Sequence, residues 1–325
     1  MQTKLVVSSS PFLRDASVST RRLMGDVVIA LIPTALAAIW FFGAPALALM
    51  LVSVVFAVLS ELVYEKITHQ KTTIDDLSAV VTGLLLAFNL PANAPWWMAA
   101  IGSIIAIVLV KQMFGGIGQN FINPALAART ILMLSWAGLI AATALPAGGQ
   151  LFGLTTVPVD AVASATPLVS SSYSLWQLFI GDVPGMLGET CKLTLILGGV
   201  YLIVRKVIDW RIPVFFIATA FILFWIQTGV IYSVESGTDN ALYQILSGGL
   251  LLGAFFMATD YATSPVTNVG RVIMGVGCGL FLFVIRAYAS YPEGCSFAIL
   301  LMNVATPLID KYTMPKAFGE VKKHG

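Results

Sequence analysis

The chain has 325 residues, of which 58% are hydrophobic and only 10% are charged. About a quarter of the residues in a soluble domain are charged, so this composition excludes a soluble globular protein. The formal net charge of +2 is too small to suggest nucleic-acid binding, and no such partner is expected.

Apolar runs recur along the whole chain. Several approach or exceed the roughly 20 residues that an α-helix needs to cross the core of a lipid bilayer. They lack the alternating pattern of outer-membrane barrel strands. The sequence therefore predicts an all-α polytopic membrane protein with about ten transmembrane helices, near 27–42, 45–65, 77–90, 96–113, 122–142, 189–208, 212–230, 241–258, 270–288 and 296–311.

The basic residues predict the orientation of these helices. With a cytoplasmic N-terminus, every Lys and Arg except Arg129, Lys192 and Arg286 falls at or beyond a cytoplasmic helix end. Segment 143–188, the longest hydrophilic one, contains no Lys or Arg. By the positive-inside rule, both termini are expected in the cytoplasm of a bacterial or archaeal cell, and this segment outside its inner membrane.

The position of the long segment predicts two repeats. It leaves five helices on each side, so the two halves should have opposite orientations, as in an inverted repeat. Similar runs at 82–88 and 248–255, each followed by a proline-containing break, support this interpretation. The expected organisation is a cytoplasmic segment 1–26, a first repeat 27–142, an external loop 143–188, a second repeat 189–311 and a cytoplasmic tail 312–325.

The chain contains no P-loop, no H-E-x-x-H motif and no C-x-x-C spacing, so no metal site is expected. Two charged residues within apolar helices are candidates for a function. Glu61, one turn before the end of its helix, is expected either on an ion path or in a contact inside the bundle. Arg129 lies one turn into its helix, where a cation is costly unless it meets an acid, a carbonyl or an anionic group. It is therefore expected to be buried.

A glycine-rich segment, F-G-G-I-G-Q-N-F-I-N-P-A-L, joins the fourth and fifth helices at residues 114–126. Its glycines would let the backbone approach a planar ligand without obstruction by Cβ. Its asparagines stand where a helix begins, with Pro124 at a favourable first-turn position. The asparagine amides are expected either to cap the helix or to bind the polar edge of a heterocycle. The residues concerned are Gly115, Gly116, Gly118, Asn120 and Asn123.

The external loop is far longer than the usual connection of about 4 to 6 residues, which indicates a function. It contains D-A-V-A-S-A-T-P-L at residues 160–168. Taken alone, this run is typical of an exposed turn.

The two segments, the five-plus-five layout and the length resemble one family of membrane subunits, the NqrB/RnfD family. It includes the RnfD component of the Rnf complexes, which are ion-pumping ferredoxin:NAD oxidoreductases, and the NqrB component of the sodium-pumping NADH:quinone oxidoreductase. The missing long N-terminal extension favours the Rnf member. The resemblance covers essentially the whole chain. It implies an electron-transfer component without a complete active site, partnered by other Rnf subunits and coupled to movement of Na⁺ or H⁺.

In that family, a flavin transferase attaches FMN by a phosphoester bond to a threonine in a D-x-x-S-G-A-T-like motif. The matching threonine is Thr166, and the other expected motif residues are Asp160, Ser164, Ala165, Pro167 and Leu168. Two positions depart from the pattern, because Ala163 replaces a hydroxyl residue and Ser164 replaces a glycine. The resemblance also implies that Asn120 and Asn123 hold a second, non-covalent flavin, riboflavin, as the alternative to a helix cap.

A small-solute channel or transporter is the alternative function. Inverted repeats with broken helices also build permeases, and one architecture hosts many functions. The loop at 143–188 distinguishes the electron-transfer function from the transport function, because a permease has no need for a long external segment with an acceptor threonine.

Overall fold

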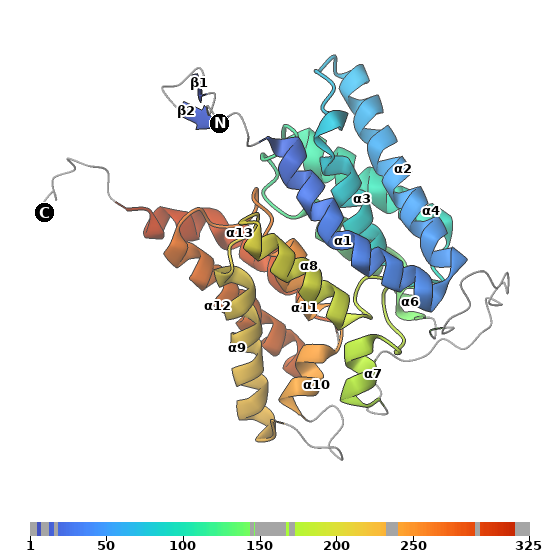
Figure 1. Cartoon of the computed structure of the whole chain (residues 1–325), viewed down its shortest axis with the longest axis vertical. Coiled ribbons are helices and arrows are strands. Elements are labelled where there is room, and N and C mark those ends of the chain that lie inside the picture. The colour runs from blue at the N-terminus through green and yellow to red at the C-terminus, as the bar shows by residue number, and fades with distance from the viewer. Residues whose placement is uncertain are drawn as a thin grey trace, which may run out of the picture.

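The computed structural model describes residues 5–7, 13–15, 19–143, 146, 167–168, 173–231, 240–289 and 293–315. These residues are mainly helical (Figure 1). Two short strands near the N-terminus, β1 (Leu5–Val7) and β2 (Leu13–Asp15), pair antiparallel. The prediction of an all-α polytopic membrane protein is confirmed.

The first half of the chain contains the five predicted helical regions. Its fourth helix continues from α-helical into π-helical and 3₁₀ geometry, and its fifth divides into α5 and α6. The elements are α1 (Thr20–Phe42), α2 (Ala44–Ile67), η1 (Ile74–Asp76), α3 (Ser78–Phe88), α4 (Trp96–Ile104), η2 (Ile105–Lys111), η3 (Gln112–Phe114), α5 (Pro124–Ser135) and α6 (Ala137–Ala141).

The second half contains the other five regions, preceded by the short helix α7. Its third region is broken into α10, α11 and the π-helical η5. The elements are α7 (Leu175–Ile180), α8 (Lys192–Val204), α9 (Arg211–Thr228), α10 (Ala241–Leu246), α11 (Leu250–Leu252), η5 (Gly253–Met257), α12 (Asn268–Tyr288) and α13 (Cys295–Thr313).

Five of the described helical stretches are long and apolar enough to cross a membrane: α1, α2, α9, α12 and Trp96–Phe114. The helices α3, α5 and α8 are apolar but shorter. The outer face of α2 shows how such a helix meets lipid. Large apolar side chains are exposed at every fourth position, namely Leu47, Leu51, Val55, Leu59 and Val63. Small and polar residues such as Ser53 and Ala57 face inward.

Two boundaries differ from the prediction for local reasons. Helix α1 begins at Thr20 rather than near residue 27, because the Ser19 hydroxyl caps it by accepting a hydrogen bond from the Arg22 backbone at 3.3 Å. The predicted helix 241–258 is interrupted after α10, where Gly248 adopts a φ of 66°. Glycine takes this left-handed conformation at little cost.

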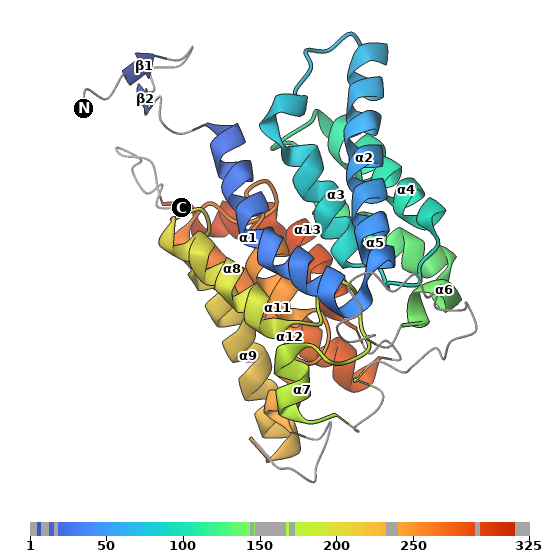
Figure 2. The same ribbon diagram turned by 45° about the vertical axis from the view of Figure 1, so that its right-hand side comes forward.

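The two halves pack in corresponding pairs (Figure 2). The first helices of the halves, α1 and α8, lie side by side, and the fifth helices, α5 and α13, also contact each other. Within the halves, α2 packs against α4 as α9 packs against α12. These pairings are those expected of two inverted five-helix repeats.

The break after α3 is covered by the segment that leads into α8. The Gly188 backbone N–H donates to the Phe88 carbonyl at 2.9 Å, and the Leu187 N–H donates to the Leu90 carbonyl at 3.0 Å. Irregular backbone at membrane depth requires such partners, because lipid offers none. The pairing fixes the entry to α8 against the end of α3.

Candidate functional site: a polar cavity between the two halves

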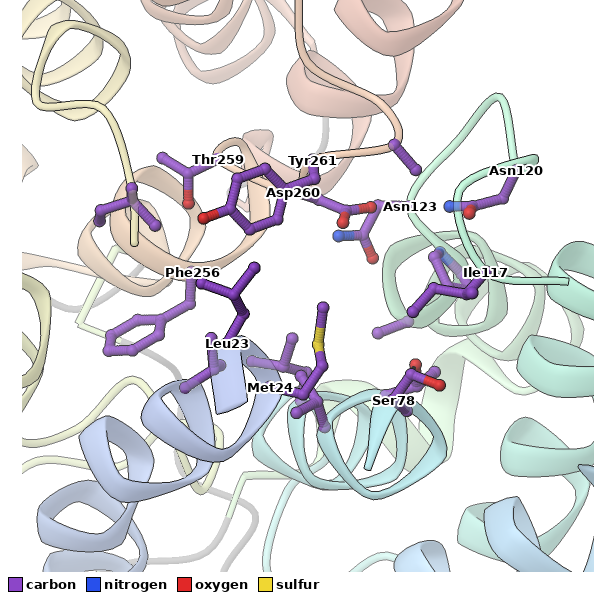
Figure 3. A pocket seen from close by; sticks show the side chains of 18 of the residues that line it. Leu23, Met24, Ser78, Ile117, Asn120, Asn123, Phe256, Thr259, Asp260 and Tyr261 are labelled. Atoms are coloured by element: carbon purple, nitrogen blue, oxygen red, sulfur yellow. Dashed lines mark hydrogen bonds between the residues drawn. The ribbon is translucent and has the colours of Figure 1, made fainter. Parts of the chain in front are cut away.

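A cavity of about 370 Å³ lies where helix ends from both halves meet (Figure 3). Its walls come from the starts of α1, α3 and α5 and from the ends of η2, α8 and η5. In the predicted order of spans, all of these ends lie on one side of the bilayer. Apolar side chains form most of the lining of this central cavity, and its polar lining includes Ser78, Thr82, Asn120, Asn123, Thr259 and Asp260.

Asn123 joins the two halves at this cavity. Its Oδ1 accepts a hydrogen bond from the Leu126 backbone N–H at 3.2 Å, so Asn123 is the N-cap of α5. Its Nδ2 donates to the Met257 carbonyl, also at 3.2 Å, at the end of η5. The predicted helix cap is therefore present, and the same side chain also lines the cavity.

Asn120 and Asp260 form a second polar contact across the halves. The Asn120 amide donates to the Ile122 carbonyl at 3.1 Å and lies near the Asp260 carboxylate (Figure 3). Burial raises the pKa of Asp260, and hydrogen bonds from Ala262, Thr263 and Asn120 only partly offset this effect. Asp260 forms no ion pair with any described residue. The sequence marked only a break at 259–265 and did not single out this carboxylate.

The glycines of the 114–126 segment serve its backbone conformation. Gly115, Gly116 and Gly118 have φ values of 113°, 89° and 82°, all in the left-handed region. Gly118 lines the cavity, yet a Cβ added there would meet nothing within 4 Å. The left-handed φ of Gly118 gives a backbone reason for this glycine, and its close approach to a ligand stays a prediction.

A buried ion pair borders the cavity. Lys111 Nζ lies 2.6 Å from Glu61 Oε1 and 2.6 Å from the Ser78 hydroxyl. Gln112 donates to the same glutamate oxygen at 2.6 Å. Glu61 thus makes a contact inside the bundle, one of its two predicted roles. Lys111 and Ser78 both line the cavity. The sequence did not identify either of them as a site residue.

Arg129 is buried and meets an acid, as predicted. Its guanidinium donates to Asn89 Oδ1 at 3.0 Å and to the Ser296 hydroxyl at 2.7 Å, and pairs with Glu293. Glu189 approaches the same guanidinium. A Cβ added to Gly249 would lie 2.8 Å from Glu189 Oε2 and 4.0 Å from Arg129 Nη1, so both side chains border this glycine. Arg129 therefore ties α5 to the break after α3 and to the start of α13.

The expected FMN motif lies partly outside the described residues. The structure describes Pro167 and Leu168 but not Asp160, Ser164, Ala165 or Thr166. The Tyr243 hydroxyl of α10 donates to the Pro167 carbonyl at 3.0 Å. The residue after the expected acceptor threonine is thereby fixed against the second half of the bundle.

These features define a polytopic membrane protein with an internal site of small-molecule size, since ligand pockets commonly enclose about 300–1,000 Å³. Residues 6–319 match the model of the NQR2, RnfD, RnfE family, and the chain belongs to that family. The resemblance that two short segments predicted is confirmed over nearly the whole chain.

Three relatives illustrate the match, and each is the D subunit of an ion-translocating complex. The chain is 47% identical to that of the Na⁺-translocating ferredoxin:NAD⁺ oxidoreductase complex of Acetobacterium woodii, over 99% of this chain and 97% of the relative. It is 41% identical to the D subunit of the proton-translocating ferredoxin:NAD⁺ oxidoreductase complex of Clostridium ljungdahlii, over 96% of this chain and 96% of the relative. It is 34% identical to that of the ion-translocating oxidoreductase complex of Escherichia coli, over 97% of this chain and 99% of the relative.

Proposed function

We propose that this chain is the D subunit of an ion-translocating ferredoxin:NAD⁺ oxidoreductase complex. The observation that carries the proposal is 47% identity to a protein of that name, over nearly the full length of both chains. The whole complex is the enzyme, and this chain holds electron carriers in the membrane beside the other Rnf subunits.

In this function, Thr166 carries FMN as a phosphoester installed by a flavin transferase. Support comes from the match of Asp160, Ala165 and Thr166 to the family motif and from the anchored carbonyl of Pro167. When bound, FMN supplies the acceptance and release of electrons, and the protein supplies position.

The central cavity binds a second, non-covalent flavin. Its volume suits a small heterocyclic ligand, and apolar side chains such as Leu23 and Phe256 would cover the faces of a ring. Asn120, Asn123 and Asp260 offer donors and an acceptor to a polar edge. Lys111, whose charge is paired with that of Glu61, lies on the same wall.

Both termini and the central cavity face the cytoplasm, and the 143–188 loop faces outward. The distribution of Lys and Arg supports this orientation. The two flavin sites then lie toward opposite faces of the membrane, so electrons passing between them move across it.

Covalent attachment is tested by producing the chain together with a flavin transferase. After denaturing electrophoresis, we expect flavin fluorescence in the wild-type band and none in Thr166→Ala. Thr155→Ala, which removes another threonine of the same loop, is the matched control and should stay fluorescent. Intact mass and peptide mapping then locate the added FMN.

Unchanged fluorescence in Thr166→Ala would place the attachment elsewhere. A non-fluorescent wild-type chain would contradict covalent FMN and favour the channel or transporter alternative. Acid precipitation of the native protein tests the second site separately, because only a non-covalent flavin enters the supernatant. Loss of that flavin in Asp260→Ala, with the covalent band retained, is the expected result.

A further inference from the structure

A second recess of about 370 Å³ opens beside the central cavity, between the α8–α9 turn and the start of α12. No role proposed above uses this recess, the α8–α9 cleft. Its polar lining consists of Lys206, Asp209, Thr259, Ser264 and Arg271, and its aromatic lining of Trp210 and Tyr261.

Positive charge dominates the cleft. The Asp209 carboxylate accepts from Arg271 at 2.7 Å and from Arg211 at 2.8 Å, so one anion serves two guanidinium groups. Burial opposes ionisation of Asp209, but hydrogen bonds from Arg211 and Arg271 outweigh it and lower its pKa. Lys206 is exposed and forms no ion pair among the described residues. The cleft therefore attracts anions.

Lys206 occupies a backbone position that normally favours glycine. The N–H of Lys206 donates to the Ile203 carbonyl at 3.0 Å, and the N–H of Val207 donates to the Leu202 carbonyl at 2.9 Å. This pair of bonds is the Schellman motif that ends α8, and Lys206 takes its left-handed position with a φ of 57°. A lysine there is disfavoured, which points to a use for its side chain.

The surroundings of the cleft are amphipathic. Trp210 and Tyr261 are about half exposed, as aromatic residues at a membrane interface often are. Val204 on α8, Val214 on α9 and Val269 on α12 are exposed apolar residues of the adjoining helices. Cations beside an exposed apolar surface match a phospholipid better than a soluble anion.

We propose that the α8–α9 cleft binds the headgroup phosphate of an anionic phospholipid. Lys206 and Arg271 contact the phosphate, and the acyl chains lie along the exposed faces of α8 and α9. Basic recesses between membrane helices are known sites for anionic headgroups. The proposal does not rest on the assignment of either flavin.

The test compares lipids retained by the purified full-length chain, measured by native mass spectrometry after exchange into defined mixtures. Dioleoyl phosphatidylglycerol should be retained about fivefold better than dioleoyl phosphatidylcholine, as expected for one basic side chain at a membrane surface. Lys206→Asn removes the charge and keeps a residue that tolerates the left-handed region, so it should abolish the preference. Lys206→Arg should preserve the preference, and the loop control Lys71→Asn should not change it.

Folding is monitored in the same variants. Lys206→Gly should raise the thermal stability of the chain while losing the lipid preference, because glycine relieves the backbone and removes the cation. Equal retention of both lipids by the wild type would overturn the proposal. Displacement of phosphatidylglycerol by millimolar inorganic phosphate, with no dependence on acyl chains, would also overturn it by indicating a soluble-anion site.

Discussion

Asp260 gives the central cavity a titratable group in a mostly apolar wall. Its carboxylate lies beside Asn120 and Asn123 in Figure 3, where it can accept a hydrogen bond from a ligand. An ordinary aspartate has a pKa of about 3.9, and burial raises that of Asp260. Protonation therefore begins at a higher pH than usual, and it turns an acceptor into a donor.

We expect riboflavin binding to weaken as the pH falls, because burial raises the pKa of Asp260 and its protonation begins at a higher pH than that of an ordinary aspartate. Asp260→Asn should bind weakly and without this pH dependence. Equilibrium dialysis of the purified chain at several pH values measures both affinities. The same pH dependence in Asp260→Asn would assign the titration to another group.

The Glu61–Lys111 pair predicts a second residue-scale effect. Lys111→Met leaves the Glu61 carboxylate buried without its cation, which should destabilise the protein by about 3–5 kcal/mol. The double variant Lys111→Met, Glu61→Leu removes both charges and should recover most of that loss. Thermal unfolding in one detergent measures the series, and a melting temperature unchanged by Lys111→Met would show that the pair adds nothing to stability.

At the scale of elements, the apolar runs predicted the helices well, because length and hydropathy alone determine what can cross a bilayer. The positions of the helix ends were predicted less accurately. Sequence placed the first helix near residue 27, but the Ser19 cap extends it back to Thr20. The division at Gly248 depends on a left-handed backbone that Leu-Gly-rich sequence does not specify.

Close packing of α2 and α3 rests on Gly83. Its carbonyl accepts from the Ser53 hydroxyl at 2.7 Å, and an added Cβ would lie 2.9 Å from backbone atoms of Ser53 and Val54. Gly83→Ala should therefore force the helices apart and destabilise the chain by about 1–3 kcal/mol, as overpacking usually does. Gly138→Ala is the control, because a Cβ there meets nothing within 4 Å. Equal melting temperatures for the two variants would contradict this account.

At the scale of the whole molecule, the site combines segments that lie far apart in the chain. Sequence reasoning found Asn120 and Asn123 because one short motif contains both. It missed Ser78, Lys111 and Asp260, which only the packing of the halves brings to the same cavity. Thr166 and its upstream neighbours lie outside the described residues, so their assignment stays a prediction.

Orientation is a property of the entire bundle and can be tested with engineered thiols. The three native cysteines are buried, which lowers background labelling. In intact cells, Ser170→Cys in the external loop should react with a membrane-impermeant maleimide. Lys322→Cys in the C-terminal tail should react only after permeabilisation, and the opposite pattern would invert the proposed topology.

Tyr261 is part of two walls, since it lines both the central cavity and the α8–α9 cleft, and its hydroxyl is held by the Val207 carbonyl. A partition common to two compartments can couple their occupancies, and thermodynamic reciprocity then requires that each ligand alter the affinity of the other by the same factor. The composition of the surrounding membrane would then regulate how firmly the protein keeps its redox cofactor.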